Sequence, residues 1–218
     1  DFINNGIIKD SSDNQYHELF LNISGNIENN GTWNNYKTIL IGTDARTITT
    51  NTTIESQYID IAGDFELTDG NPTFTGAVDF DYGANGHTIT VISPQIITFG
   101  GTTHSSNGTF IGPATIKLTG DLHYGTVFTT EKVILNKSGI ISTYTNVTIN
   151  GDLEITNGTT LQNYNYSSSC IFTINGNIIN NGTIKNNDNR GTLSISTSGN
   201  IENNRIWSPY TTKLLTDV

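Results

Sequence analysis

The 218-residue chain is poor in residues that several classes of protein require. Its single cysteine, Cys170, has no partner for a disulfide within the chain, so cysteine usage does not indicate a redox compartment. Basic residues number 10 against 20 acidic ones, and the net charge of −10 argues against binding nucleic acid or an anionic membrane surface. No uncharged apolar run approaches the roughly 20 residues that span a bilayer. We therefore expect neither nucleic-acid binding nor membrane insertion.

The abundant residues are those of short strands and tight turns. The chain holds 29 Asn, 35 Thr, 16 Ser and 22 Gly, and only 14% of its residues are charged. Threonine is β-branched and suits exposed strand positions, whereas Asn and Gly suit turns that need positive φ. This composition predicts an all-β protein with an uncharged polar surface, and nothing in it indicates helix.

One short sequence pattern recurs six times: apolar-x-apolar-x-Gly-Asx-apolar. With the glycine as position zero, position +1 is always Asn or Asp, and positions −4 and +2 are always apolar. Two-residue alternation around a fixed Gly-Asx predicts a strand, a bend and a second strand. We expect the side chains at position −4, which include Leu21, Ile116 and Phe172, to point into a hydrophobic core. The marker glycines are Gly25, Gly63, Gly120, Gly151, Gly176 and Gly199.

The spacing of these glycines predicts the fold. Successive glycines are 38, 57, 31, 25 and 23 residues apart, which we interpret as a coil of roughly 19–25 residues per turn, with the first two spacings covering two and three turns. Weaker markers at 38–43 and 96–101 fill the gaps. No helical half-repeat accompanies the strands, and parallel crossovers favour the right hand. We predict an all-β, right-handed parallel β-helix (β-solenoid) of about nine or ten turns, forming one domain over residues 1–218.

The recurring Asn-Asn-Gly follows the second strand of the pattern. Asn29, Asn180 and Asn203 are candidates for a ladder of side-chain amides stacked between turns. The chain itself starts one residue late, with Asp1 at position +1, and no polar capping helix is visible at either end. We therefore expect a segment of a longer rod, prone to end-to-end self-association through its open edges.

The turns written "GNIxNNGT" and "INGDLxI" resemble the right-handed β-helix repeats of bacterial secreted and surface proteins, adhesin-like and broadly of the pectin-lyase-like solenoid type. The resemblance covers most of the chain and is weakest over 70–115. It implies an extracellular or cell-surface location. These motifs specify a fold far better than a function, because functional sites are grafted onto folds.

Two groups of residues are candidate metal sites. Asp60, Asp64 and Glu66 are expected to face outward together, either as a solvated acidic surface or as a Ca²⁺ site. No base lies near them, since Arg46, Lys117 and Lys132 are distant in sequence, so catalysis there is not expected. His104 and His123 are 19 residues apart, about one turn, and could hold a transition metal with Asp121. The simpler interpretation is that repetition stacks two outward histidines.

The remaining conspicuous residues favour structural roles. Cys170 aligns with Leu19 and Leu193, which predicts a small core residue. Trp33 and Trp207 occupy the same place after Gly25 and Gly199, where a third copy has an isoleucine, and we expect both in the core.

Two kinds of residue could form a binding array. Outward tyrosines, namely Tyr58, Tyr124, Tyr164 and Tyr166, could stack on sugar rings, but they do not form one repeated row. Threonine runs at 46–53, 88–90 and 143–145 suggest ice binding, but they do not recur at one repeat position.

The sequence is most consistent with a non-catalytic extracellular structural or adhesion rod of a surface protein, with polysaccharide or other surface proteins as partners. We expect no catalytic residues and no cofactor beyond the Ca²⁺ considered above. The alternative is a carbohydrate-binding or carbohydrate-active β-helix, similar to polysaccharide lyases or hydrolases, and an ice-binding protein is a third reading.

Overall fold

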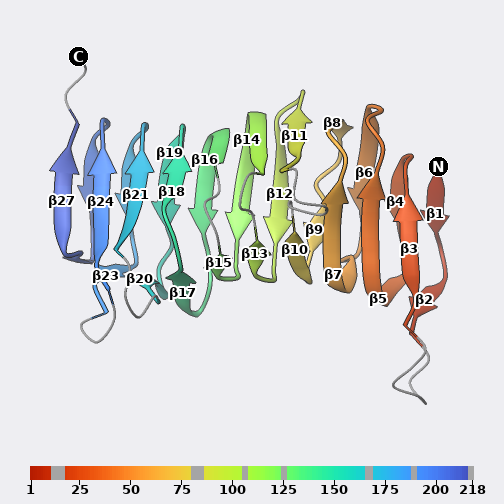
Figure 1. The fold of residues 1–218 in the computed structure, drawn as a ribbon, viewed down its shortest axis with the longest axis horizontal. Coiled ribbons are helices and arrows are strands. Elements are labelled where there is room, and N and C mark those ends of the chain that lie inside the picture. Colours follow the sequence, from red (N-terminus) through yellow and green to blue (C-terminus); the bar gives the residue numbers. More distant parts are fainter. Residues whose placement is uncertain are drawn as a thin grey trace.

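The computed structural model confirms the predicted architecture: the chain is an all-β parallel solenoid of about nine turns (Figure 1). It describes residues 1–10, 18–79, 86–104, 108–123, 127–164, 169–187 and 191–215. The two termini lie at opposite ends of the stack (Figure 1). In the described part of the chain, no helix is long and apolar enough to cross a membrane.

Each turn of the coil presents three faces, and every strand pair in the described ranges is parallel. The first face is made of β1 (Phe2–Asn4), β4 (Ile27–Asn29), β6 (Arg46–Thr50), β8 (Phe65–Asp69), β11 (Thr88–Val91), β14 (Thr109–Leu118), β16 (Val127–Leu135), β18 (Val147–Ile149), β21 (Cys170–Ile174), β24 (Leu193–Thr197) and β27 (Thr211–Leu214).

The second face contains β2 (Ile7–Lys9), β9 (Thr73–Phe74), β12 (Gln95–Phe99), β19 (Asp152–Ile155), β22 (Ile178–Asn180) and β25 (Ile201–Asn203), together with the C-terminal halves of β14 and β16. The third face contains β3 (Phe20–Ile23), β5 (Thr32–Ile41), β7 (Glu55–Ala62), β10 (Ala77–Asp79), β13 (Thr103–His104), β15 (Leu122–His123), β17 (Gly139–Thr143), β20 (Thr159–Asn163), β23 (Thr183–Lys185) and β26 (Ile206–Ser208). The N-terminal halves of β5 and β7 bend onto the second face, where Ile54 bridges to Phe74.

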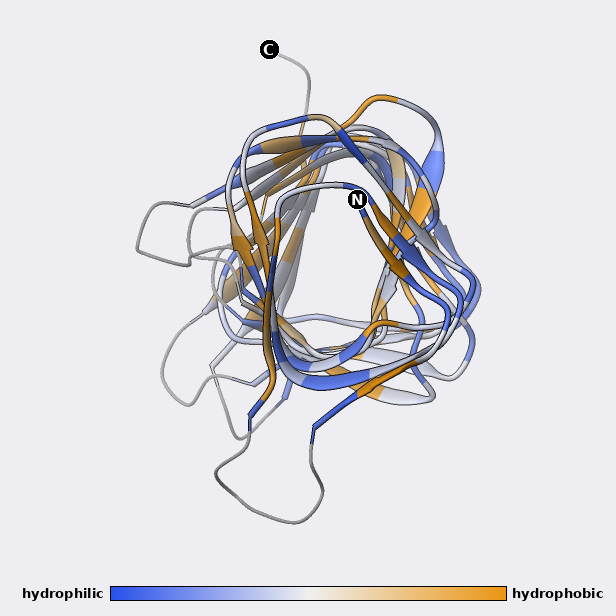
Figure 2. Ribbon diagram, turned by 90° about the vertical axis from the view of Figure 1, so that its right-hand side faces the viewer, coloured by the Kyte–Doolittle hydropathy of each residue, from blue (hydrophilic) through white to orange (hydrophobic). Residues whose placement is uncertain are grey.

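Alternating side chains fill one continuous interior, and the ribbon seen along the coil shows the turns stacked in line around it (Figure 2). The position −4 side chains that were predicted to point inward do so: Ile116 and Phe172 are fully buried, and Leu21 packs against the core at the first turn. Aromatic rings also stack inside, with Phe110 and Phe128 centroids 5.8 Å apart and nearly parallel. Turn lengths vary, since Phe110 pairs with the residue 18 positions later and Val147 with the residue 25 positions later.

The marker glycines lie at three different corners of the coil, which corrects their interpretation as one column. Gly63 stacks on Gly42 between the third and first faces, Gly120 on Gly101 between the second and third, and Gly176 on Gly151 between the first and second. The spacings of 57 and 31 residues therefore do not correspond to whole turns. At each corner the backbones approach so closely that an added Cβ would meet the carbonyl oxygen of the turn beneath.

The Asx residue after each marker glycine joins consecutive turns. Its side-chain oxygen accepts a hydrogen bond from a backbone N–H of the following turn at five of the six copies. The donors and acceptors are Thr47 to Asn26 (2.8 Å), Thr88 to Asp64 (2.7 Å), Ser142 to Asp121 (3.0 Å), Asn177 to Asp152 (2.7 Å) and Asn200 to Asn177 (3.0 Å). Either Asn or Asp can supply this acceptor, which explains why both occur at one position.

The predicted asparagine ladder exists as two separate pairs on different faces. Asn4 donates to Asn29 at 2.8 Å on the first face, and Asn180 donates to Asn203 at 2.7 Å on the second. The pairing of Asn4 with Asn29 also confirms the predicted register of the first copy.

The tryptophans are divided in the same way. Trp33 is fully buried on the second face, whereas Trp207 is half-buried and stacks on Ile184 on the third. Each indole N–H reaches the hydroxyl of the threonine five residues later, so the local structure of the two copies is alike although their places on the rod differ.

Candidate functional site on the outer faces

The structure splits the predicted acidic cluster between two faces. Asp60 lies on the third face, and its carboxylate is 2.6 Å from the Lys37 ammonium with only 4% of its side chain exposed. Burial raises the pKa of Asp60, Lys37 lowers it, and the neighbouring Asp79 raises it further. Lys37 is a base that the sequence analysis missed, because it lies one turn away and no motif marks it.

Asp64 and Glu66 belong to the first face and its corner. Asp64 accepts the Thr88 N–H at 2.7 Å and lies 3.3 Å from the His87 ring nitrogen Nδ1. Glu66 is exposed on β8. Asp60 and Asp64 are therefore in separate local contacts, and the structure does not bring them together as a Ca²⁺ site would require.

His104 and His123 pair in register on β13 and β15, as the 19-residue spacing predicts. Asp121, their proposed companion, instead accepts the Ser142 N–H at 3.0 Å and lies 3.4 Å from the Lys137 ammonium. The His123 ring packs against Tyr144. Within the residues that the structure describes, no group of three His, Cys, Asp or Glu side chains is placed to hold a metal ion.

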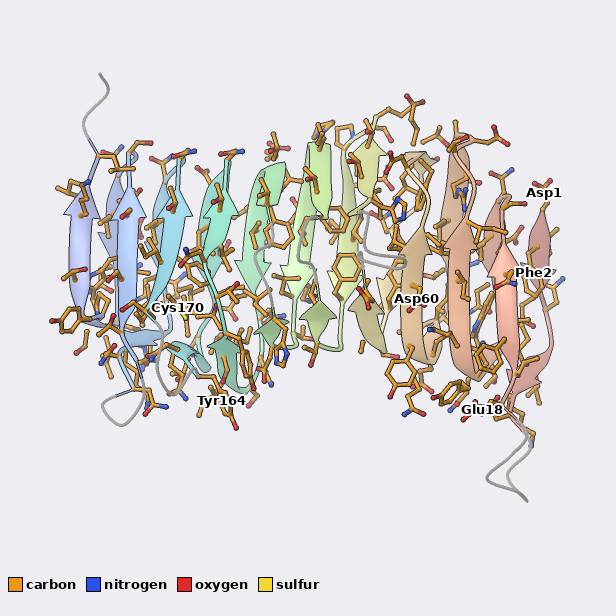
Figure 3. All side chains as sticks on the ribbon, viewed as in Figure 1. Asp1, Phe2, Glu18, Asp60, Tyr164 and Cys170 are labelled. Carbon is orange, nitrogen blue, oxygen red and sulfur yellow. The ribbon has the colours of Figure 1, made fainter. Side chains whose placement is uncertain are left out.

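The outward tyrosines do not form one repeated row, as expected, but with neighbouring rings they form two short rows on the third face, the second of which includes Tyr164 (Figure 3). In the first row, Tyr36 lies between Phe20 and Tyr58, with ring centroids 5.5 and 5.3 Å apart. In the second row, Tyr144 lies between His123 at 3.6 Å and Tyr164 at 4.5 Å. Tyr124 and Tyr166 lie outside the described residues.

As expected, the threonine runs do not share one repeat position, but single outward threonines recur from turn to turn of the first face. Thr88 pairs with Thr109 on the next turn of the first face. Thr148 lies two turns beyond Thr109 and pairs with Thr173 on the turn that follows it. The run at 143–145 does not join them, because Thr143 is fully buried on the third face.

The coil encloses a thiol and a cationic side chain. Cys170 pairs with Leu193 as predicted and is fully buried, and burial raises the pKa of its thiol, which keeps it protonated and unreactive. Arg46 is also buried: its guanidinium donates to the Ile41 carbonyl at 2.8 Å and lies 4.2 Å above the Phe65 ring. Burial lowers the pKa of Arg46.

A shallow groove follows one corner near the N-terminal end. It is lined by Asn5, Asn30, Thr32, Thr52 and Glu55, and its asparagines are linked from turn to turn, with Asn30 donating to Asn5 at 2.9 Å. These contacts repeat the stacking seen elsewhere along the corners, so the groove is part of the coil's own architecture.

Comparison of the chain with protein-family models, with curated proteins and with solved structures found no match.

Proposed function

We propose that this protein is a non-catalytic structural or adhesion rod of the extracellular or cell-surface kind, which holds other modules or partners at a fixed distance. The proposal rests on one observation: the polar side chains at the corners form hydrogen bonds between consecutive turns. The Asx oxygens at the corners, including those of Asp64 and Asp121, bind backbone N–H groups of the next turn. Carboxylates that could have served chemistry are therefore committed to joining turns.

The ion pairs on the faces also join consecutive turns. Lys37 meets Asp60 one turn later, and Lys132 meets Glu154 at 2.5 Å, also one turn later. Together with a single core that runs through every turn, these contacts favour a stiff body whose length grows with the number of turns. The resemblance of its turns to adhesin-like repeats supports the surface location.

A rod makes a measurable prediction about distances along its axis. Pairs of cysteines for spin labels can be introduced in a Cys170→Ala background at outward positions of one column of the second face. The three double variants carry cysteines at positions 98 and 154, 98 and 179, and 98 and 202. We expect narrow distance distributions whose means increase by about 4.8 Å for each added turn. Broad distributions, or means that do not follow the turn count, would contradict a rigid spacer.

The other parts of the proposal need separate measurements. Antibody labelling of intact cells of the source organism is expected to detect the protein on the surface.

Incubation of the purified chain with a panel of polysaccharides is expected to release no new reducing or unsaturated ends. Release of such ends would establish an enzyme and overturn the non-catalytic role.

Carbohydrate binding is a second candidate, and the aromatic rows of the third face favour it. Phe20, Tyr58 and Tyr164 are between 38% and 51% exposed, and exposed ring faces pack against the apolar faces of sugars. The test is a glycan array with the wild-type chain and with a Tyr144→Ala/Tyr164→Ala variant. Binding that the variant loses would support this candidate, and an array without signal would remove it.

A further inference from the structure

The first face carries an extended patch without charge. It comprises twelve outward side chains on six consecutive turns, from β11 to β24, and we call it the neutral face. One column holds Thr88, Thr109, Val127, Thr148, Thr173 and Ser196, and the other holds Thr90, Ile111, Thr129, Asn150, Asn175 and Ser198. None of the twelve is buried.

The lack of charge distinguishes this face from the adjoining second face, and exposed Glu131, two residues after Thr129 on β16, marks the corner between them. The adjoining second face, over the same turns, presents Lys117, Lys132, Asp152, Glu154 and Glu202. At its two ends the neutral face stops at charged residues, Glu66 on β8 and Lys213 on β27. In a chain with a net charge of −10, these twelve residues on six consecutive turns carry no charge, and none of them is aromatic.

The neutral face is also ordered in two directions. Stacked strands place its side chains about 4.8 Å apart along the axis, and alternation places the two columns about 6.5 Å apart across it. Hydrogen bonds hold one column in line, since Asn150 donates to Thr129 at 2.8 Å and Asn175 donates to Asn150 at 2.7 Å. β-Branched side chains have restricted χ1 angles, so the threonine methyl and hydroxyl groups keep fixed directions.

This chemistry selects among possible occupants. Sugar polymers are recognised by aromatic platforms, which this molecule has on its third face and not among these twelve residues. Protein interfaces use aromatic and arginine anchors, which the neutral face also lacks. Half of the twelve residues are threonine and the rest are small polar or aliphatic residues, so the face is a two-dimensional array of neutral polar and methyl groups. Such an array matches a partner that repeats in two dimensions and accepts or donates hydrogen bonds at regular intervals. We propose that the neutral face binds the surface of ice.

The proposal is independent of the rod function and is tested on the purified full chain. We expect it to partition into slowly growing ice, to shape ice crystals and to inhibit their recrystallisation, with serum albumin as the non-binding reference. Thr148→Tyr/Thr173→Tyr places two bulky rings on the neutral face and should reduce the ice-bound fraction to that of albumin. Thr98→Tyr/Thr115→Tyr, at comparably half-buried positions of the second face, should leave it unchanged.

Circular dichroism establishes that both variants fold, and Thr148→Ser, which removes only a methyl group, serves as a milder second variant that should weaken ice binding in part. A wild-type chain that stays in the liquid and leaves ice unshaped overturns the proposal. So does a neutral-face variant that binds ice as well as the wild type, or a control variant that loses binding equally. The spin-label distances report on the rod separately, because they do not depend on ice.

Discussion

Asn180 shows how the interior of the coil accepts a polar residue. It is fully buried, its amide nitrogen donates to the Asn203 side chain at 2.7 Å and to the Ile206 carbonyl at 3.0 Å, and its oxygen accepts the Gly182 N–H at 3.1 Å. All of these partners lie at one corner. The side chain therefore fixes the bend after its strand and joins it to the next turn.

Removing this amide should be costly. Asn180→Ala leaves the buried Gly182 N–H without its acceptor and removes the donor to the Ile206 carbonyl, and we expect the free energy of unfolding to fall by about 1–3 kcal/mol. Asn204→Ala removes a similar turn-to-turn bond on the surface and should change stability by less than about 0.5 kcal/mol. Urea denaturation followed by circular dichroism measures both, and equal effects would contradict the role given to burial.

Asp60 should make stability depend on pH in an unusual direction. Its pKa in the folded protein is raised from 3.8, so protonated Asp60 favours the folded state. The stability it contributes is complete below pH 3.8 and is lost as the pH rises through the folded-state pKa. In Asp60→Asn this loss is absent, so the variant should gain stability relative to the wild type as pH rises. Urea denaturation from pH 3 to 7 tests this, and a constant difference would show that burial does not govern Asp60.

Where the marker motif occurs, the corner is built from a strand, a Gly-Asx bend and another strand. Glycine is needed because the turns stack with their backbones in contact, and Asx is needed because its oxygen reaches the N–H of the next turn. The pattern therefore specifies a bend whose Asx oxygen can hydrogen-bond to the next turn.

The importance of the Asx oxygen can be tested at Asp152, which accepts the Asn177 N–H at 2.7 Å. Asp152→Asn keeps an acceptor at the same place and should change stability little. Asp152→Ala removes it, and we expect a loss of about 1 kcal/mol in the free energy of unfolding. If the alanine and asparagine variants unfold at the same urea concentration, the acceptor is not what the motif preserves.

The sequence was sufficient to predict the coil, the turn length and most of the core, because the two-residue alternation around each glycine depends only on local residues. It could not predict the face on which each copy lies, since the bends at all three corners are built from the same residues. Copies such as those at Gly63 and Gly120 therefore looked equivalent, although they belong to different corners.

The surface arrays were missed for a related reason, which is that turn length varies. His123, Tyr144 and Tyr164 are separated by 21 and then 20 residues, whereas Thr148 and Thr173 are separated by 25. A fixed period does not align them. Only pairing between turns shows that Lys37 faces Asp60, because neither residue belongs to a repeated motif.

At the scale of the whole molecule, each turn contacts only the turns before and after it. Stability is then approximately the sum of the turns and their shared interfaces. Turns in the middle of the described stack have two such interfaces, and the first and last described turns have one.

Amide hydrogen exchange should reveal this gradient. We expect the slowest exchange in the central strands, from β12 to β21, and the fastest in β1, β2, β26 and β27 of the 218-residue chain. Mass spectrometry of peptic fragments gives the protection of each strand. Uniform protection from one end to the other would mean instead that the rod opens as one unit.

The stretches at 25–33 and 199–207 are nearly the same sequence, yet they begin at different corners and so look out in different directions. A duplicated segment need not contain a whole number of coils to be accommodated. Inserting a segment shorter than one full turn would rotate all the following turns about the long axis. The same amino-acid sequence would then present its side chains on a different side of the rod without any substitution.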